Sequence, residues 1–206
     1  MKPLFTAIAA SLMLLSYTGA HAASTVDLTV KGLITPSACT PSLSSGGVID
    51  HGKISAKDLR PDNPTRIGTH VMTMAVVCDS AIRFALHSVD NRAGSSISTF
   101  DYGLGLINGT QKLGWFQLRL LNPIADGVAV QPIASFNGQD NWYSEQFWDS
   151  GLYMSVATMD DATQPVAMKE LMVDLEMTTS IARTDGLDLS NEVTLDGSAT
   201  LEVKYL

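Results

Sequence analysis

Apolar and polar residues alternate with a period of two in segment after segment of this 206-residue chain. The last segment shows the pattern most clearly: from Val193 to Tyr205 every second residue is apolar or small, and the residues between them are polar. Such alternation is typical of a β-strand with one buried face. A chain that ends on a strand of this kind has its terminus tied into a sheet.

Other segments with the same alternation follow one another at intervals of about ten residues, and turns that contain Gly and Pro separate them. Residues 169–177 include good helix formers, but their side chains divide into two faces with period two, which favours a strand. No segment is a convincing helix. The pattern predicts an all-β sandwich, with strands at residues 26–34, 48–54, 66–78, 82–89, 102–107, 115–121, 128–133, 152–158, 165–181 and 193–206.

Residues 1–22 have the composition of a secretory signal peptide. Lys2 gives a basic start, residues 4–17 are mostly apolar, and Ala20 and Ala22 are small residues at the two positions that a signal peptidase reads. The apolar stretch is shorter than the roughly 20 residues that a permanent membrane-spanning helix needs. We therefore expect an exported chain with a single domain at residues 23–206 and no integral membrane segment after cleavage.

The chain contains two cysteines, Cys39 and Cys78. An even number of cysteines in an exported chain predicts a disulfide, because the compartments outside the cytoplasm are oxidising. A catalytic thiol is the less favoured interpretation, since neither cysteine belongs to a Cys-x-x-Cys pair. A disulfide that closes a loop of about 40 residues is expected to stabilise the fold by roughly 3 to 4 kcal/mol.

The charge and the motifs argue against several function classes. The formal net charge is −8, and it becomes −9 once Lys2 is removed, with the basic residues scattered along the chain. Nucleic acid is therefore not an expected partner. His51, His70 and His87 lack metal-ligand spacing, and neither a Gly-x-Ser-x-Gly motif nor a P-loop is present. We expect no enzyme activity, no catalytic residue, no cofactor and no bound metal.

An aromatic cluster lies in the central region, where regular patterning is weak. Trp142, Tyr143 and Trp148 are the candidate ligand-stacking residues, since exposed aromatic rings in a loop can stack on sugar rings. The alternative, that these side chains cover one end of the sandwich as part of the core, is favoured because large aromatic residues mostly supply buried area.

Several of these features together resemble the subunits of chaperone-usher fimbriae of Gram-negative bacteria, the pilins. The alternating residues 26–34 precede Cys39 as a donor strand precedes the first pilin cysteine, and Cys78 stands where the second would. The stretch VIDHGKI, residues 48–54, resembles the short strand after the first cysteine. The ending ATLEVKYL, with Tyr205 second from last, resembles the C-terminal strand that periplasmic chaperones bind.

A closer resemblance is to the uncharacterised GltF-like periplasmic family, which is often encoded beside fimbrial chaperone and usher genes. It rests on ITPSACTP at residues 34–41, GGVIDHGK at 46–53, DNR at 90–92 and VTLDGSATLEVKYL at 193–206. These stretches cover the first third and the last fifth of the chain. The family has no settled function to carry over to this chain.

The pilin resemblance implies an immunoglobulin-like, antiparallel β-sandwich that lacks its last strand. A chaperone strand fills the open edge first, and the N-terminal strand of the next subunit then replaces it. Residues 23–35 become the candidate donor strand, through Val26, Leu28, Val30, Gly32 and Ile34. The candidate chaperone-contacting residues of the C-terminal strand are Leu201, Val203 and Tyr205.

The partners implied are a periplasmic fimbrial chaperone and usher and other pilin-like subunits, at the periplasm or cell surface of a Gram-negative bacterium. One departure concerns polymerisation: where pilins usually carry a glycine near the C-terminus this chain has Val193, and its nearest glycine is Gly197. The alternative is a self-complete periplasmic binding or accessory protein, whose own N-terminal strand closes the sandwich.

Overall fold

The computed structural model describes Thr29 and residues 38–206. The predicted signal peptide and the candidate donor-strand residues Val26, Leu28, Val30, Gly32 and Ile34 lie outside the described residues. Residues 38–206 all belong to one compact unit. Within them, no helix has the length and apolar character that crossing a bilayer requires.

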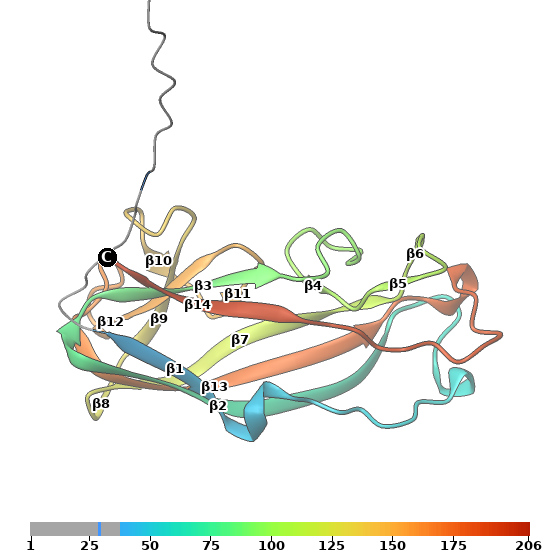
Figure 1. Cartoon of the computed structure of the whole chain (residues 1–206), viewed down its shortest axis with the longest axis horizontal. Coiled ribbons are helices and arrows are strands. Elements are labelled where there is room, and N and C mark those ends of the chain that lie inside the picture. The colour runs from blue at the N-terminus through green and yellow to red at the C-terminus, as the bar shows by residue number, and fades with distance from the viewer. Residues whose placement is uncertain (1–28, 30–37) are drawn as a thin grey trace, which may run out of the picture. The chain divides into compact units, whose positions relative to one another are not determined.

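The larger of the two main sheets contains the longest strands of the molecule (Figure 1). Its neighbours pair in the order β1-β2-β13-β7-β11, and two short strands, β4 and β8, also pair with β7. The bounds are Cys39–Leu43 for β1, Thr65–Ile82 for β2, Tyr102–Gly103 for β4, Gly114–Ala125 for β7, Val128–Ala129 for β8, Phe147–Trp148 for β11 and Met168–Ile181 for β13.

The second sheet has the order β10-β9-β12-β3-β14, so the C-terminal strand β14 lies at its edge. Its strands are β3 (Phe84–Asp90), β9 (Gln131–Ser135), β10 (Tyr143–Ser144), β12 (Tyr153–Ala157) and β14 (Ala199–Tyr205). A small hairpin joins β5 (Leu106–Ile107) and β6 (Gln111–Lys112). Every pairing among the described residues is antiparallel, which confirms the predicted all-β, immunoglobulin-like antiparallel sandwich.

The core lies between the two sheets and follows the alternation in the sequence. On β13, Leu171, Val173 and Leu175 are buried, while Met172 is exposed on the opposite face. This confirms that residues 169–177 form a strand despite their helix propensity, because burial of one face against the other sheet outweighs the small intrinsic preference.

The predicted disulfide is confirmed. Cys39 and Cys78 are direct partners in the β1–β2 ladder, and their sulfur atoms are bonded. The bond ties the edge strand β1 to β2, the long strand beside it (Figure 1). Cys78 is buried, so the disulfide also belongs to the core.

Two strand predictions were wrong, one of them entirely and the other in the residue at which the strand begins. Residues 48–54 pair with no strand among the described residues, and Gly52, with a φ of 61°, interrupts them. Residues 193–198, predicted to continue the last strand, also form no ladder, and β14 begins only at Ala199. In contrast, β1 was not predicted at all, because Pro36 and Pro41 flank Cys39 and weaken any strand pattern there.

Candidate strand-binding site

The two segments that form no strand, residues 48–54 and 193–198, line opposite sides of an apolar groove. Its first compartment, of about 240 Å3, has β14 and residues 195–198 on one side, and β1, β2 and residues 47–51 on the other. Strands β7 and β13 form the floor, and they are seen between β14 and β2 in Figure 1. The apolar side chains that line it are Leu43, Ile49, Met72, Leu104, Phe116, Leu118, Leu175, Met177, Leu195, Ala199 and Leu201.

A second compartment, of about 540 Å3, shares Ile49, His51 and Leu195 with the first. It lies between residues 49–59 and residues 189–195. The two compartments therefore form one continuous groove, which follows the C-terminal segment from Leu189 to Leu201.

The main chain of β14 is unpaired along the groove. In an antiparallel ladder, residues alternate between positions that bond to the neighbouring strand and positions that do not. The N–H of Asn91 donates to the carbonyl of Ser198, and the N–H of Leu206 donates to that of Arg83, so the even-numbered residues bond to β3. The main-chain groups of the odd-numbered residues point away from β3, and within residues 38–206 no other strand bonds to them.

The opposite wall also has an unpaired edge. β2 pairs with β13 along most of its length, but β1 covers its other edge only from Met74 to Cys78. Beyond that point the N–H of Thr73 is bound by Ser44 Oγ at 3.0 Å, and residues 48–54 run past without a ladder. Both sides of the groove thus offer main-chain donors and acceptors.

The candidate chaperone-contacting residues lie together on β14. Leu201 and Val203 are half-buried and pack against the core, which leaves part of each side chain open to the groove side. The Tyr205 hydroxyl accepts a hydrogen bond from the N–H of Cys39 at 2.9 Å. This contact joins the ends of β14 and β1 and closes one end of the space between the two sheets.

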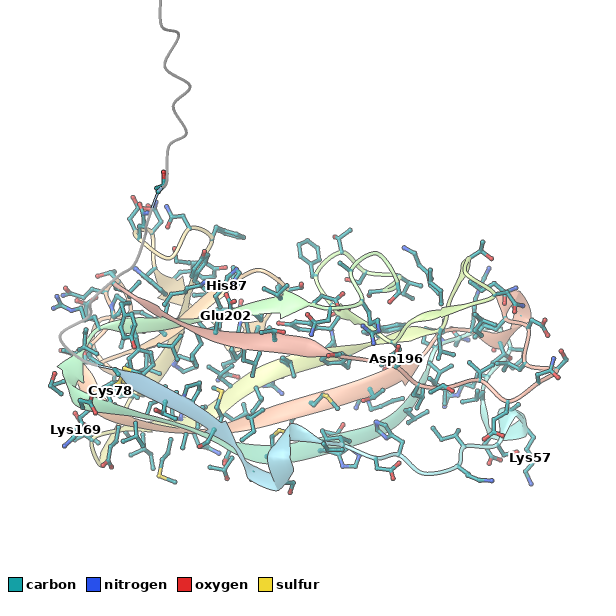
Figure 2. All side chains as sticks on the ribbon, viewed as in Figure 1. Lys57, Cys78, His87, Lys169, Asp196 and Glu202 are labelled. Carbon is teal, nitrogen blue, oxygen red and sulfur yellow. A yellow bond between two sulfur atoms is a disulfide. The ribbon has the colours of Figure 1, made fainter. Side chains whose placement is uncertain are left out.

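His87, Asp196 and Glu202, which are labelled in Figure 2, belong to charged pairs along the β14 wall. Glu202 lies 3.6 Å from His87 on β3 and 2.7 Å from Lys204. Ahead of the strand, the Arg92 guanidinium donates two hydrogen bonds to Asp196, at 2.8 and 2.7 Å. The Arg92–Asp196 and His87–Glu202 pairs link this wall to β3 and the turn after it, whereas Glu202 and Lys204 belong to the same strand.

Gly197 lines the groove on the side of β14. A Cβ atom at this position would be 2.8 Å from Leu104 Cδ2 and 3.1 Å from the Phe116 ring. Both contacts are shorter than ordinary van der Waals packing, so only a glycine lets the main chain pack this closely against Leu104 and Phe116. The sequence drew attention to Gly197 only as the glycine nearest to Val193, and the structure gives it this steric role.

His51 lies at the junction of the two compartments, and His70 packs against it. The rings of His51 and His70 meet edge to face with centroids 5.0 Å apart, and His51 Nε2 lies 3.0 Å from Thr179 Oγ1. Partial burial, and next the nearby His70, lower the pKa of His51, while Asp50 opposes this shift. The sequence places these histidines in separate strand candidates without metal-ligand spacing, and the structure brings their rings into contact.

The lowered pKa of His51 predicts that acid destabilises the groove. Because the unfolded chain binds this proton more readily than the folded chain, the contribution of His51 to stability is complete above pH 6.5, the ordinary pKa. It is lost as the pH falls through the lower folded-state pKa. Urea unfolding from pH 7.5 to 5 should show a smaller loss of stability for His51→Gln than for the original chain.

Replacement of His70 provides the control for this prediction. His70→Gln should raise the pKa of His51, because the charge of His70, which lowers this pKa, is removed. NMR titration of the His51 ring measures the change. Equal acid sensitivity of the original chain and the His51→Gln variant would contradict the prediction.

The aromatic cluster is mostly core, so two of the ligand-stacking candidates were wrong. Trp148 is 1% exposed and its Nε1–H donates to the carbonyl of Leu152, and Trp142 is 7% exposed in a small cluster with Ile133. A ring buried in this way has no face for a ligand. Tyr143 remains partly exposed, beside the exposed Phe136.

Within residues 38–206, no group of three or more His, Cys, Asp or Glu side chains is arranged to hold a metal ion. The groove has an apolar floor and, along β14, main-chain groups without a ladder partner among the described residues, which are features of sites that take up an extended polypeptide.

Comparison with known proteins gives relatives without an assigned activity. Residues 28–111 match a family described as a protein of unknown function (DUF1120). The chain is 27% identical to the uncharacterized protein YhcF of Escherichia coli K12, across 91% of this chain and 93% of that protein. It is 24% identical to protein GltF of the same organism, across 97% and 96%. None of these descriptions names a fimbrial role.

Proposed function

We propose that this chain is an exported, fimbrial-subunit-like structural or adhesion protein, whose sandwich is completed by a β-strand from another chain. One observation carries the proposal: the groove is flanked by unpaired main-chain edges on both sides. The disulfide supports a location outside the cytoplasm, where such bonds persist. The location proposed is the periplasm or cell surface.

An open sheet edge above an apolar floor is a template for strand addition. Main-chain hydrogen bonds supply affinity in this mode, while alternate side chains enter pockets and supply specificity. Ala199, Leu201 and Val203 are only half-buried even though they face the core side. An added strand would cover them and pair with β14 at the same time.

Residues 23–35 of a second copy or of a related subunit are the proposed occupant. This segment alternates apolar and polar residues, and it equals residues 193–205 in length. A periplasmic chaperone with a similar strand, and an usher that arranges the exchange, complete the proposed set of partners.

Peptide binding tests this proposal. A peptide of residues 23–35 is expected to bind the chain that starts at Pro36, as measured by fluorescence anisotropy. Gly197→Leu should weaken binding at least about tenfold, because the added side chain meets Leu104 and Phe116. Gly186→Leu is the matched control, since a Cβ atom there meets nothing within 4 Å.

A change in the peptide separates lost binding from misfolding. Val30→Asp in the peptide leaves the protein untouched and should also weaken binding, because a charge would enter an apolar groove. Binding that is absent, or unaffected by both Gly197→Leu and the peptide change, would overturn the proposal.

The self-complete alternative is supported by the position of Cys39. Its N–H binds Tyr205, so the chain enters β1 at the closed end of the groove. A hairpin turn before Cys39 would place the protein's own residues 23–35 in the same groove. In that case the chain from Ala23 stays monomeric at high concentration, and removal of residues 23–35 unfolds it.

A further inference from the structure

A second depression lies on the outer face of the larger sheet, away from the groove. Its volume is about 330 Å3, at the lower end of the range for ligand pockets. Four neighbouring strands contribute to it. Its side chains form two rows, and the residues of each row are cross-strand partners in the sheet. Phe147, Arg119 and Glu176 are successive cross-strand partners, and so are Gln117, Thr178 and Thr69 in the next row.

Side-chain contacts connect the residues of the first row. Arg119 donates to Glu176 Oε1 at 3.2 Å and to Gln146 Oε1 at 2.9 Å, and its guanidinium carbon lies 4.9 Å from the centre of the Phe147 ring. Phe147 nevertheless remains 45% exposed, because it faces away from the core that buries its neighbour Trp148. The row thus presents an aromatic surface next to a fixed, charged pair.

The remaining side chains keep unused hydrogen-bonding capacity. Within the described part of the chain, neither the Gln117 amide nor the Arg66 guanidinium has a side-chain hydrogen bond or ion pair, although both line the depression. The hydroxyl groups of Thr69 and Thr178 bond to each other at 3.1 Å and keep further acceptor sites.

This combination matches the chemistry of a sugar. A sugar ring presents an apolar C–H face, which packs on an aromatic ring, and hydroxyl groups, which bond to planar amide, guanidinium and carboxylate groups. Two arginines against one glutamate give the depression a net positive charge within an acidic chain. Arg66, the unpaired arginine, is placed to bind a carboxylate.

We propose that this depression binds an oligosaccharide that contains a sugar acid. Phe147 packs against the ring, Gln117 and the threonine pair bind hydroxyl groups, and Arg66 binds the carboxylate. The inference is independent of the strand-binding groove, because the two sites share no residue.

A panel of oligosaccharides with uronic or sialic acids, together with their methyl esters and neutral sugars, tests the proposal on the chain from Ala23 onward. Acidic oligosaccharides are expected to bind, and the esters at least about threefold more weakly. Phe147→Ala should weaken binding at least about tenfold, whereas Arg66→Gln should remove the preference for the acid over its ester.

Two matched controls lie outside the depression. Phe136→Ala removes a phenylalanine that is 79% exposed, and Arg183→Gln removes an exposed arginine that pairs with Asp185. Neither should change binding. The proposal is wrong if no acidic oligosaccharide binds at millimolar concentration, if the controls weaken binding as much as Phe147→Ala, or if the neutral sugars bind as tightly as the acidic ones.

Discussion

A chain in which residues 23–35 are moved from the N-terminus to follow Leu206, through a short Gly/Ser linker, is expected to gain about 4 kcal/mol in its free energy of unfolding. The reference is the chain that starts at Pro36 and ends at Leu206. The gain corresponds to a strand that binds with a Kd of about 1 µM at an effective concentration of about 1 mM.

The geometry of β14 makes this arrangement possible. β14 is an edge strand that ends one residue before the C-terminus. A strand that follows through a tight turn would run back along the unpaired edge as the second arm of a hairpin. It would reach from Tyr205 toward Gly197 and cover the half-buried Leu201 and Val203. Urea unfolding should show both a higher midpoint and a larger m-value, since more surface becomes buried.

The matched control is the same rearranged chain with Leu28→Asp and Val30→Asp in the added strand. It keeps the linker and the length but places two charges against an apolar floor, so the gain should disappear. If the rearranged chain is no more stable than its control, the groove does not accept this segment, and the proposed donor strand is wrong.

The C-terminal segment illustrates what the sequence could predict. Its alternation predicted correctly which side chains face the core, because period two reports the burial of one face. The alternation could not predict that pairing begins only at Ala199. A ladder needs a neighbouring strand, and the pattern within one segment carries no information about its neighbours. Residues 48–54 differ from their prediction for the same reason, because their main chain forms no ladder with the strands beside it.

The aromatic cluster shows a similar limit. Composition identified residues 142–148 as a place where binding or burial could occur, but it did not separate Trp148 from Phe147. Successive residues on a strand point to opposite faces, so one of this pair had to face outward once β11 was formed. Only the pairing of β11 with β7 decides that Trp148 enters the core and that Phe147 joins Arg119.

Removal of the disulfide between Cys39 and Cys78 is expected to lower the stability of the fold substantially. The double variant Cys39→Ser/Cys78→Ser should lose roughly 3 to 4 kcal/mol in its free energy of unfolding, because the unfolded chain regains the freedom of the loop between these residues. Urea unfolding of the oxidised protein and of the variant measures the loss. Ser42→Ala, on the same strand and exposed, is the control and should change stability by less than about 0.5 kcal/mol.

The same variant also tests the link between the disulfide and the groove. β1 is an edge strand of five residues, and its Leu43 lines the groove while its Cys39 binds Tyr205. Without the disulfide, only main-chain pairing holds β1 to β2. The position of Leu43 in the groove wall and the contact between Cys39 and Tyr205 should therefore both become less well fixed. Binding of the residue 23–35 peptide should therefore weaken in the double variant even under conditions where the sandwich stays folded. A variant that loses stability but binds the peptide with unchanged affinity would show that β1 contributes to the fold without shaping the site.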